Sequence, residues 1–345
     1  MSPNISPQSS CLRRERDRQA QRPQREQAFL RALCVLCGST APSGVSSLAL
    51  ALRDAHGCHL RRSLDFLALT KPRVVLMVLA TAMVGFYLAS PSVPNFSLLA
   101  QALVGIALAA GGTLALNQYL ERDVDAKMAR TRHRPLPDGR VRPGEALGFG
   151  VGLAAVGLGY LAVAVNPESA LVTVLITVSY LFVYTPLKRR SALCTVLGAV
   201  PGALPPVVGW VAARGEFGPG AWILFGILFL WQLPHTLAIA SVYRADYACA
   251  GLQFTPIGDP DGGSTRRQVV VACVALLIMG ALPSAAGIAG PLYLTGAVLL
   301  GTGFLACGLA LAVSRSARDA RRLAFTSLVY LPALLFLMAI DRIPL

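Results

Sequence analysis

The chain has 345 residues, of which 54% are hydrophobic and 14% are charged, and its formal net charge is +14. Soluble domains carry about 25% charged residues, so this composition indicates a protein of the lipid bilayer. The basic residues gather in short loops beside apolar stretches. That pattern is typical of membrane topology and argues against a nucleic-acid-binding surface.

Residues 1–63 differ from the rest of the chain, because they are rich in Arg, Gln, Ser and Pro. Such a segment buries too little apolar surface to fold, so we predict a disordered or loosely surface-bound N-terminal extension. An organellar targeting segment is an alternative, which Glu15, Asp17 and Glu26 disfavour. An overlong reading frame is another.

From residue 64 to 345 the sequence predicts one membrane-embedded domain. A spanning helix needs roughly 20 apolar residues, and the chain supplies nine such stretches. The predicted spans are 72–89, 97–120, 146–165, 169–185, 192–212, 220–241, 268–288, 291–313 and 323–340. The fold class is therefore an all-α bundle of nine transmembrane helices.

The loops between these spans alternate in charge. Those after the second, fourth, sixth and eighth spans are basic, whereas the intervening loops contain Arg214 and no other Lys or Arg. Cytoplasmic loops hold the excess of Lys and Arg. The alternation therefore predicts that the N-terminus and the basic loops face the cytoplasm and that the C-terminus faces away.

A polar cluster ends the second predicted span. Asn117, Glu121 and Asp125 are four residues apart, a spacing that puts three oxygen-bearing side chains on one helix face. Such oxygens suit Mg²⁺, which proteins usually hold with one or two carboxylates together with substrate phosphates. The cluster predicts a magnesium site at the membrane surface.

Basic side chains follow this cluster. Arg130 and Arg134 are again four apart, and Arg is well shaped for bidentate contact with phosphate. Lys188, after the fourth span, is expected on the same membrane side. Carboxylates beside these cations indicate a diphosphate site. The plainer alternative is a charged helix end with topology-setting arginines and a Lys188 that merely anchors its helix.

A second cluster surrounds the end of the sixth span. Asp246 offers another carboxylate on the same predicted side, and Arg244 offers another phosphate contact. His235 lies inside the span, where it could bind haem, handle a proton or form a structural hydrogen bond. Charged groups at a span's edge are costly, which makes these residues functional candidates.

Several motifs from about residue 64 to the C-terminus resemble one known family. The matching segments, in order, are Leu69-Thr-Lys-Pro-Arg73, Asn117-x₃-Glu121-x₃-Asp125, Arg130-Thr-Arg-His-Arg-Pro-Leu-Pro137, Tyr184-Thr-Pro-Leu-Lys-Arg189, Trp231-Gln-Leu-Pro-His235 and Asp246-Tyr-Ala-x-Ala-Gly251. The chain thereby resembles the UbiA-type prenyltransferases, and within them the haem O synthases (protohaem IX farnesyltransferases). The acidic motif is common to the superfamily, and the Lys-Pro, Pro-His and Asp-Tyr-Ala segments select the haem branch.

The resemblance implies a nine-helix bundle with a central cavity. The implied enzyme transfers the farnesyl group of farnesyl diphosphate to a vinyl group of haem B, with Mg²⁺ as cofactor, and gives haem O and diphosphate. It implies a bacterial inner membrane, or the mitochondrial one in a eukaryote, with the active site facing the cytoplasm. Haem A synthase is a candidate partner.

The resemblance also implies roles for individual residues. By carry-over, Asn117, Glu121 and Asp125 hold one Mg²⁺ and Asp246 holds another, while His235 helps to place the haem. The basic residues expected to contact the diphosphate or the haem propionates are Arg130, Arg134, Lys188 and Arg244.

Several positions depart from the family pattern. Glu121 stands where Asp is usual, and Ala245, Cys249 and Thr236 replace a usual Asp, Arg and Phe. The alternatives are therefore a related enzyme that prenylates a quinone precursor, and an inactive haem-handling homologue. A transporter or channel is a further alternative, disfavoured because the charges gather at one membrane face rather than near the midplane.

Overall fold

The computed structural model describes residues 61–91, 93–259 and 261–343. The chain divides into two units, Met1–Leu64 and Asp65–Leu345. The predicted N-terminal extension lies almost wholly outside the described residues, so it stays a prediction. Everything below concerns the second unit.

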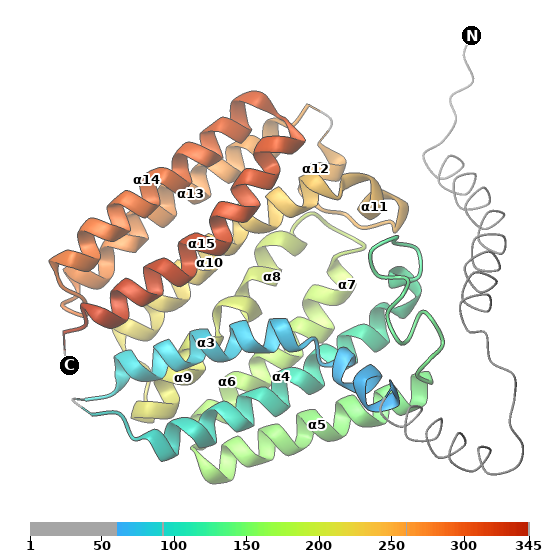
Figure 1. The fold of residues 1–345 in the computed structure, drawn as a ribbon, viewed down its shortest axis with the longest axis horizontal. Coiled ribbons are helices and arrows are strands. Elements are labelled where there is room, and N and C mark those ends of the chain that lie inside the picture. Colours follow the sequence, from blue (N-terminus) through green and yellow to red (C-terminus); the bar gives the residue numbers. More distant parts are fainter. Residues whose placement is uncertain (1–60, 92, 260, 344–345) are drawn as a thin grey trace, which may run out of the picture. The chain divides into compact units, whose positions relative to one another are not determined.

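This unit consists of packed helices, and the described residues contain no β-strand apart from one isolated bridge, Ala289 to Arg342 (Figure 1). Nine helical segments of the described chain are long and apolar enough to span a membrane, which confirms the predicted all-α class and the number of spans. The uninterrupted spans are α3 (Pro72–Ala89), α4 (Phe96–Asp125), α5 (Pro143–Ala164), α10 (Pro219–Val242), α13 (Gly263–Ala285), α14 (Pro291–Ser314) and α15 (Ala317–Ile340).

The other two spans are composite. The fourth consists of α6 (Pro167–Val178), a π-helical turn η1 (Ser179–Tyr184) and α7 (Thr185–Leu187). The fifth consists of α8 (Cys194–Ala203) and α9 (Pro205–Arg214). Two short helices, α11 (Arg244–Cys249) and α12 (Thr255–Gly258), lie between α10 and α13.

Local sequence explains where many helices begin. Proline occupies the first turn of α3, α5, α6, α10 and α14, where its missing N–H costs nothing. Asn95 and Asn166 cap α4 and α6 by accepting hydrogen bonds from the backbone N–H groups of Leu98 and Ser169. The spans themselves follow the apolar runs of the sequence.

Small residues let neighbouring helices approach closely. A Cβ atom added to Gly209 in α9 would lie 1.9 Å from the carbonyl oxygen of Ala82 in α3. One added to Gly157 in α5 would lie 2.3 Å from the backbone nitrogen of Ala109 in α4. These two helix pairs therefore pack backbone against backbone, as small residues allow within a membrane.

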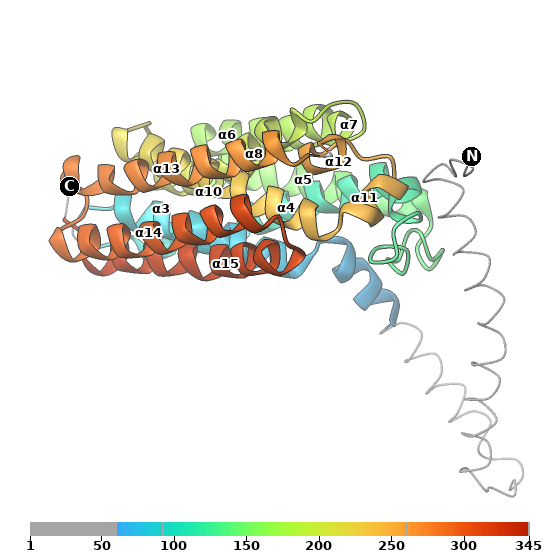
Figure 2. The same cartoon turned by 90° about the horizontal axis from the view of Figure 1, so that it is seen from above.

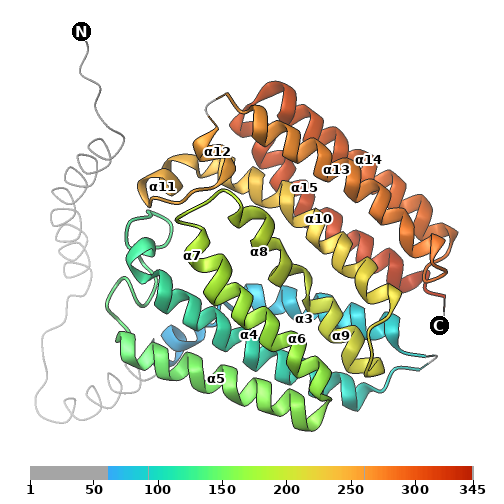
Figure 3. The same ribbon diagram turned by 180° about the vertical axis from the view of Figure 1, so that it is seen from behind.

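The basic loops gather at one end of this bundle. The loop 126–142, the turn after α7 and the short helices α11 and α12 lie at the end opposite the C-terminus (Figures 1, 2 and 3). A backbone hydrogen bond of 2.7 Å from the N–H of Gln253 to the carbonyl of Lys188 joins two of these loops. The predicted functional clusters share this end.

Candidate active site

A polar cavity of about 150 Å³ lies at the end of α4. Its polar lining contains six of the residues that the sequence predicted for a site: Asn117, Glu121, Asp125, Arg130, Arg134 and Lys188. Lys71, Tyr180, Tyr184 and Tyr247 complete the polar lining, with the apolar residues Val124, Met128, Leu252 and Phe254. The structure thus brings together segments that are more than 100 residues apart in the sequence.

Asn117 lies at the bottom of this cluster and is fully buried. Its Oδ1 accepts a 3.0 Å hydrogen bond from the ammonium of Lys71, and its Nδ2 donates one of 3.1 Å to Oγ1 of Thr185. The three side chains come from three different spans or their ends. Asn117 therefore links the start of α3 to the start of α7.

Lys71 is a site residue to which the sequence assigned no role. Its backbone is left-handed, with φ 50° and ψ 66°, directly before Pro72. Residues other than glycine rarely adopt this conformation, and such backbone strain concentrates at functional positions. Burial, and then the neighbouring Arg134, lower the pKa of Lys71 to about 7. The available signal was the Lys-Pro pair at the entrance of an apolar span.

Glu121 lies on α4 one helical turn after Asn117. It forms an ion pair with Lys188, which follows α7. The Lys188 ammonium lies 2.8 Å from Oε1 of Glu121 and 4.2 Å from the ring centroid of Tyr184. Burial acts to lower the pKa of Lys188, but Tyr184 and Glu121 outweigh it and raise that pKa above its usual value. Lys188 therefore remains a cation beside the cavity.

The π-helical turn η1 brings these partners together. Oγ1 of Thr185 donates a 2.8 Å hydrogen bond to the carbonyl of Tyr180, five residues earlier. The rings of Tyr180 and Tyr184 lie 5.4 Å apart, and both face the ammonium of Lys188. π-Helical turns are rare and often occur at functional sites, because the extra residue redirects side chains.

Asp125 completes the row on α4. Its side chain is 2% exposed and accepts a 2.6 Å hydrogen bond from Arg134. Its carbonyl also accepts one of 2.9 Å from Oγ1 of Thr131, so the loop folds back over the end of α4. Arg130 also lines the cavity, and its guanidinium lies 5.6 Å from the ring centroid of Tyr243, directly after α10.

The three remaining predicted residues lie elsewhere. Arg244 lines a different cavity, and Asp246 is not among the lining side chains of either cavity, although its neighbour Tyr247 lines the polar one. His235 lies in α10, where Nδ1 is 2.6 Å from Oγ of Ser327 and the ring stacks on Trp231 at 5.0 Å. The structure gives His235 a hydrogen-bonded position between α10 and α15.

An apolar cavity of about 130 Å³ adjoins the polar one. Its lining includes Val78, Ile106, Ala110 and Val208 from α3, α4 and α9, and Tyr180 belongs to the lining of both cavities. A ligand that crosses the Tyr180 boundary meets charged groups on one side and aliphatic side chains on the other. This arrangement suits an amphiphile with an anionic head and a hydrocarbon tail.

Comparisons with known proteins agree with this arrangement. The UbiA prenyltransferase family profile matches residues 78–329. The chain belongs to the UbiA prenyltransferase family. A protohaem IX farnesyltransferase from Solibacter usitatus (strain Ellin6076) is 44% identical over 287 residues, which cover 81% of this chain and 98% of that protein.

Solved structures show the same fold at low identity. A digeranylgeranylglyceryl phosphate synthase has a TM-score of 0.68 and 15% identity, over 81% of this chain and 98% of that one. A UbiA homologue from Archaeoglobus fulgidus, bound to GPP and Mg²⁺, has a TM-score of 0.56 and 17% identity, over 79% and 99%. As a UbiA family member, the chain is a membrane-embedded prenyltransferase.

Proposed function

We propose that this chain transfers the farnesyl group of farnesyl diphosphate to a vinyl group of haem B, giving haem O and diphosphate. The observation that carries the proposal is the junction of the two cavities at Tyr180. The polar cavity takes the diphosphate, and the apolar cavity receives the prenyl chain. The protohaem IX farnesyltransferase relative supports haem B as the acceptor over a quinone precursor.

The cations of the polar cavity bind the leaving group. Lys188, Arg130 and Arg134 supply phosphate contacts that the sequence predicted, and Lys71, which is partly protonated at neutral pH because its pKa is about 7, adds a fourth contact. Arg fits phosphate oxygens in a bidentate manner, and Lys supplies a compact point charge. Together they stabilise the negative charge that grows on the diphosphate as it departs.

The donor set on α4 fits Mg²⁺. No group of three His, Cys, Asp or Glu side chains among residues 61–91, 93–259 and 261–343 could hold a metal ion. Asn117, Glu121 and Asp125 instead offer an amide and two carboxylates, and a diphosphate would supply the remaining oxygens, as is usual for this cation. Bound there, Mg²⁺ would withdraw charge from the diphosphate.

The cations and the metal ligands are already in contact with one another. Lys71 donates a hydrogen bond to Asn117. Lys188 forms an ion pair with Glu121, and Arg134 forms one with Asp125. Glu121 and Asp125 would hold the metal of a bound magnesium diphosphate, and Lys188 and Arg134 would then be free to contact its phosphates. The internal pairs thus keep the buried charges compensated before substrate arrives.

The reaction balances without another reagent except water. The bond between the allylic carbon and the bridging oxygen breaks, and diphosphate leaves with the electron pair. The vinyl group of haem B attacks the allylic carbon, and water adds to the resulting cation and gives its proton to solvent. The aliphatic lining of the apolar cavity keeps water away from the prenyl chain.

The site faces the cytoplasm in this proposal. The basic loops lie at the same end of the bundle as the polar cavity (Figure 1). Cytoplasmic loops carry the excess of Lys and Arg, so this end and the N-terminus are placed on the cytoplasmic side of a bacterial inner membrane. Asp246 and His235 keep the roles predicted for a second metal contact and for haem placement.

The deciding experiment measures the porphyrin product. Membranes containing the chain are incubated with farnesyl diphosphate, Mg²⁺ and haem B, and the porphyrins are separated and weighed by mass spectrometry. The expected product carries one added farnesyl group and one added hydroxyl group. Farnesylation of 4-hydroxybenzoate, with haem B left unchanged, would refute the proposal, and no transfer to either acceptor would favour the inactive haem-handling alternative.

A further inference from the structure

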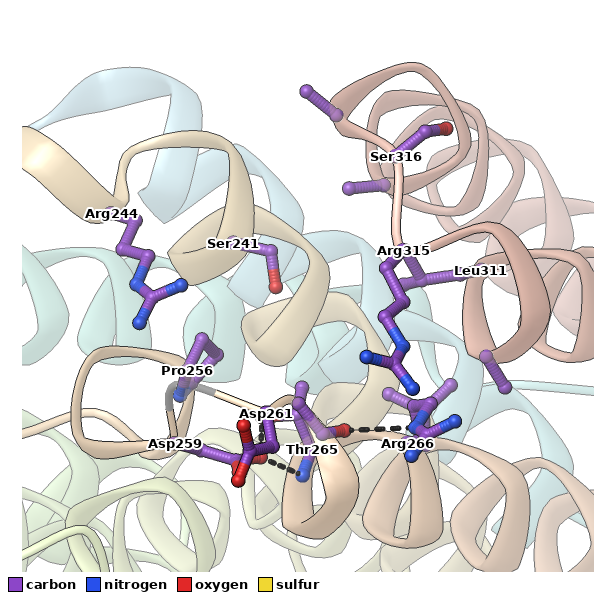
Figure 4. A pocket seen from close by; sticks show the side chains of 15 residues that line it. Ser241, Arg244, Pro256, Asp259, Asp261, Thr265, Arg266, Leu311, Arg315 and Ser316 are labelled. Carbon is purple, nitrogen blue, oxygen red and sulfur yellow. Dashed lines mark hydrogen bonds between the residues drawn. The ribbon is translucent and has the colours of Figure 1, made fainter.

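A third cavity, of about 300 Å³, lies near α12, at the end of the bundle that holds the basic loops (Figure 1), and Figure 4 shows its lining side chains. It is lined by the ends of α10 and α14, the starts of α13 and α15, and the segment around α12. Three arginines from three segments face this cavity, which we call the arginine cavity: Arg244, Arg266 and Arg315. In Figure 4, Arg244 and Arg315 extend from opposite sides, with Ser241 between them.

These guanidinium groups are available to a ligand. The ion pairs among the described residues include none of the three. Nε of Arg266 donates a 3.2 Å hydrogen bond to the carbonyl of Gly262, which leaves its two terminal nitrogens to face the cavity. The start of α13 already has a hydrogen-bond acceptor for its backbone. Oδ2 of Asp259 accepts hydrogen bonds from the N–H and Oγ1 of Thr265, at 2.7 and 2.9 Å.

The cavity contains two carboxylates, which differ in their hydrogen bonding and exposure. Asp259 is committed to the start of α13; its partial burial acts against the charge, but the hydrogen bonds from Thr265 outweigh burial and lower its pKa. Asp261 is exposed and forms no ion pair with the described residues. The three arginines outnumber the two carboxylates, so the cavity has a net positive lining that favours an anion with separated charges.

One stretch of chain, residues 244–256, contributes lining residues both to this cavity and to the polar cavity. Arg244 and Pro256 face the arginine cavity, whereas Tyr247, Leu252 and Phe254, from the same stretch of chain, face the polar cavity. A ligand held at Arg244 therefore lies one short helix away from the diphosphate. The floor of the arginine cavity is apolar, with Val269, Leu311 and Ala320.

We infer that this arginine cavity binds the two propionate carboxylates of the porphyrin acceptor, which directs the vinyl edge of the macrocycle towards the diphosphate cavity. The inference rests on the proposed function. The propionates and the vinyl groups occupy different edges of haem B, so an acceptor anchored by its carboxylates can extend towards a neighbouring site. Arg is the side chain that best matches a carboxylate by paired hydrogen bonds.

The size of the cavity agrees with this assignment. Its volume is at the lower end of the range for small-molecule pockets, so it holds the carboxylate edge rather than a whole macrocycle. The apolar floor then contacts the porphyrin rim. Carboxylates at the water-facing end and an apolar ring within the bundle match the amphiphilic character of haem B.

The test uses Arg266→Gln and Arg315→Gln, with Arg267→Gln and Arg318→Gln as matched controls that do not line the cavity. Full-length protein in detergent is assayed with haem B and with its dimethyl ester, whose propionates carry no charge. We expect each cavity variant to raise the KM for haem B about tenfold, with little change in the KM for the ester or for farnesyl diphosphate. The controls should match wild type.

A change of opposite sign adds to this test. Asp261→Asn removes a carboxylate that competes with the ligand, so it should lower the KM for haem B. Equal KM values for haem B and its ester in wild type, or a raised KM for farnesyl diphosphate in the cavity variants, would overturn the inference. So would effects no larger than those of the controls.

A binding measurement separates this inference from the proposed function. Haem B is titrated into wild type and variants without farnesyl diphosphate, and binding is followed by the porphyrin absorption band. If wild type transfers nothing to haem B, the proposed function fails while a tenfold weaker binding in the variants still supports the carboxylate site. If transfer proceeds and the variants bind haem B as tightly as wild type, the carboxylate site fails alone.

Discussion

Lys188 and Glu121 form an almost buried ion pair, with 2.8 Å between Nζ and Oε1 and side chains only 12% and 13% exposed. The two residues are 67 positions apart and belong to different spans. The pair joins the turn after α7 to the end of α4. Because the charges are shielded from water, each partner depends on the other, and we propose that the pair serves both stability and substrate binding.

Removing the cation alone should be costly. Lys188→Met leaves the Glu121 carboxylate buried without its partner, and breaking such a pair costs about 3–5 kcal/mol. The double variant Lys188→Met/Glu121→Gln removes the stranded charge, so it should recover most of the lost stability but not the prenyl transfer. Thermal unfolding in detergent and the farnesyl transfer rate measure the two effects. A double variant with wild-type turnover would contradict the role of the pair in substrate binding.

Two neighbouring aspartates at the end of α4 allow a matched comparison. Asp125 is 2% exposed and faces the cavity, whereas the side chain of Asp123 is 81% exposed. Asp125→Asn should lower kcat/KM by a factor of about 100 or more and raise the Mg²⁺ concentration needed for half-maximal rate, because a charged ligand is lost. Asp123→Asn should behave as wild type; similar losses in both variants would indicate a general effect of charge.

Composition and hydropathy were enough to predict most of the fold. The nine apolar runs predicted the spans, because a helix must satisfy its backbone hydrogen bonds internally within lipid. The ends were less accurate: the second span extends to Asp125 instead of 120, and the last begins at Ala317 instead of 323. Both extra turns are charged, and hydropathy cannot distinguish a charged helical turn from a loop.

The breaks inside two spans depend on local detail. Pro205 and Pro206 mark the division between α8 and α9, a signal present in the sequence but absorbed into one predicted span. The π-helical turn η1 has no comparable signal, because Ser179–Tyr184 contains neither proline nor glycine. Its consequence, the placement of two tyrosines beneath Lys188, could therefore not be predicted.

The site was predicted where spacing along one helix sufficed. Asn117, Glu121 and Asp125 line one cavity, as their spacing of four residues requires. The contact between Lys71 and Asn117 joins positions 46 residues apart. The placement of Arg244 in a different cavity also depends on the tertiary structure. Such relationships arise from how helices pack, and one sequence does not encode them in any local pattern.

A glycine in α8 should control the orientation of Tyr184. A Cβ atom added at Gly198 would lie 2.3 Å from the Tyr184 ring, so Gly198→Ala forces the ring to move. Because that ring contacts Lys188, we expect a roughly tenfold loss of kcat/KM for farnesyl diphosphate. Gly159→Ala in α5 has open space around the new methyl group and should be neutral or slightly stabilising. A Gly198→Ala enzyme with unchanged kinetics would show that the ring position does not matter.

The apolar cavity should select the length of the prenyl chain. Ala110 lines it from α4, whereas Val104 on the same helix is 49% exposed and faces away. Ala110→Phe adds a ring to a cavity of about 130 Å³, so it should raise the KM for farnesyl diphosphate much more than that for the shorter geranyl diphosphate. Val104→Phe should leave the ratio of the two KM values at its wild-type level. If Ala110→Phe impairs both diphosphates equally, the prenyl chain lies elsewhere in the bundle.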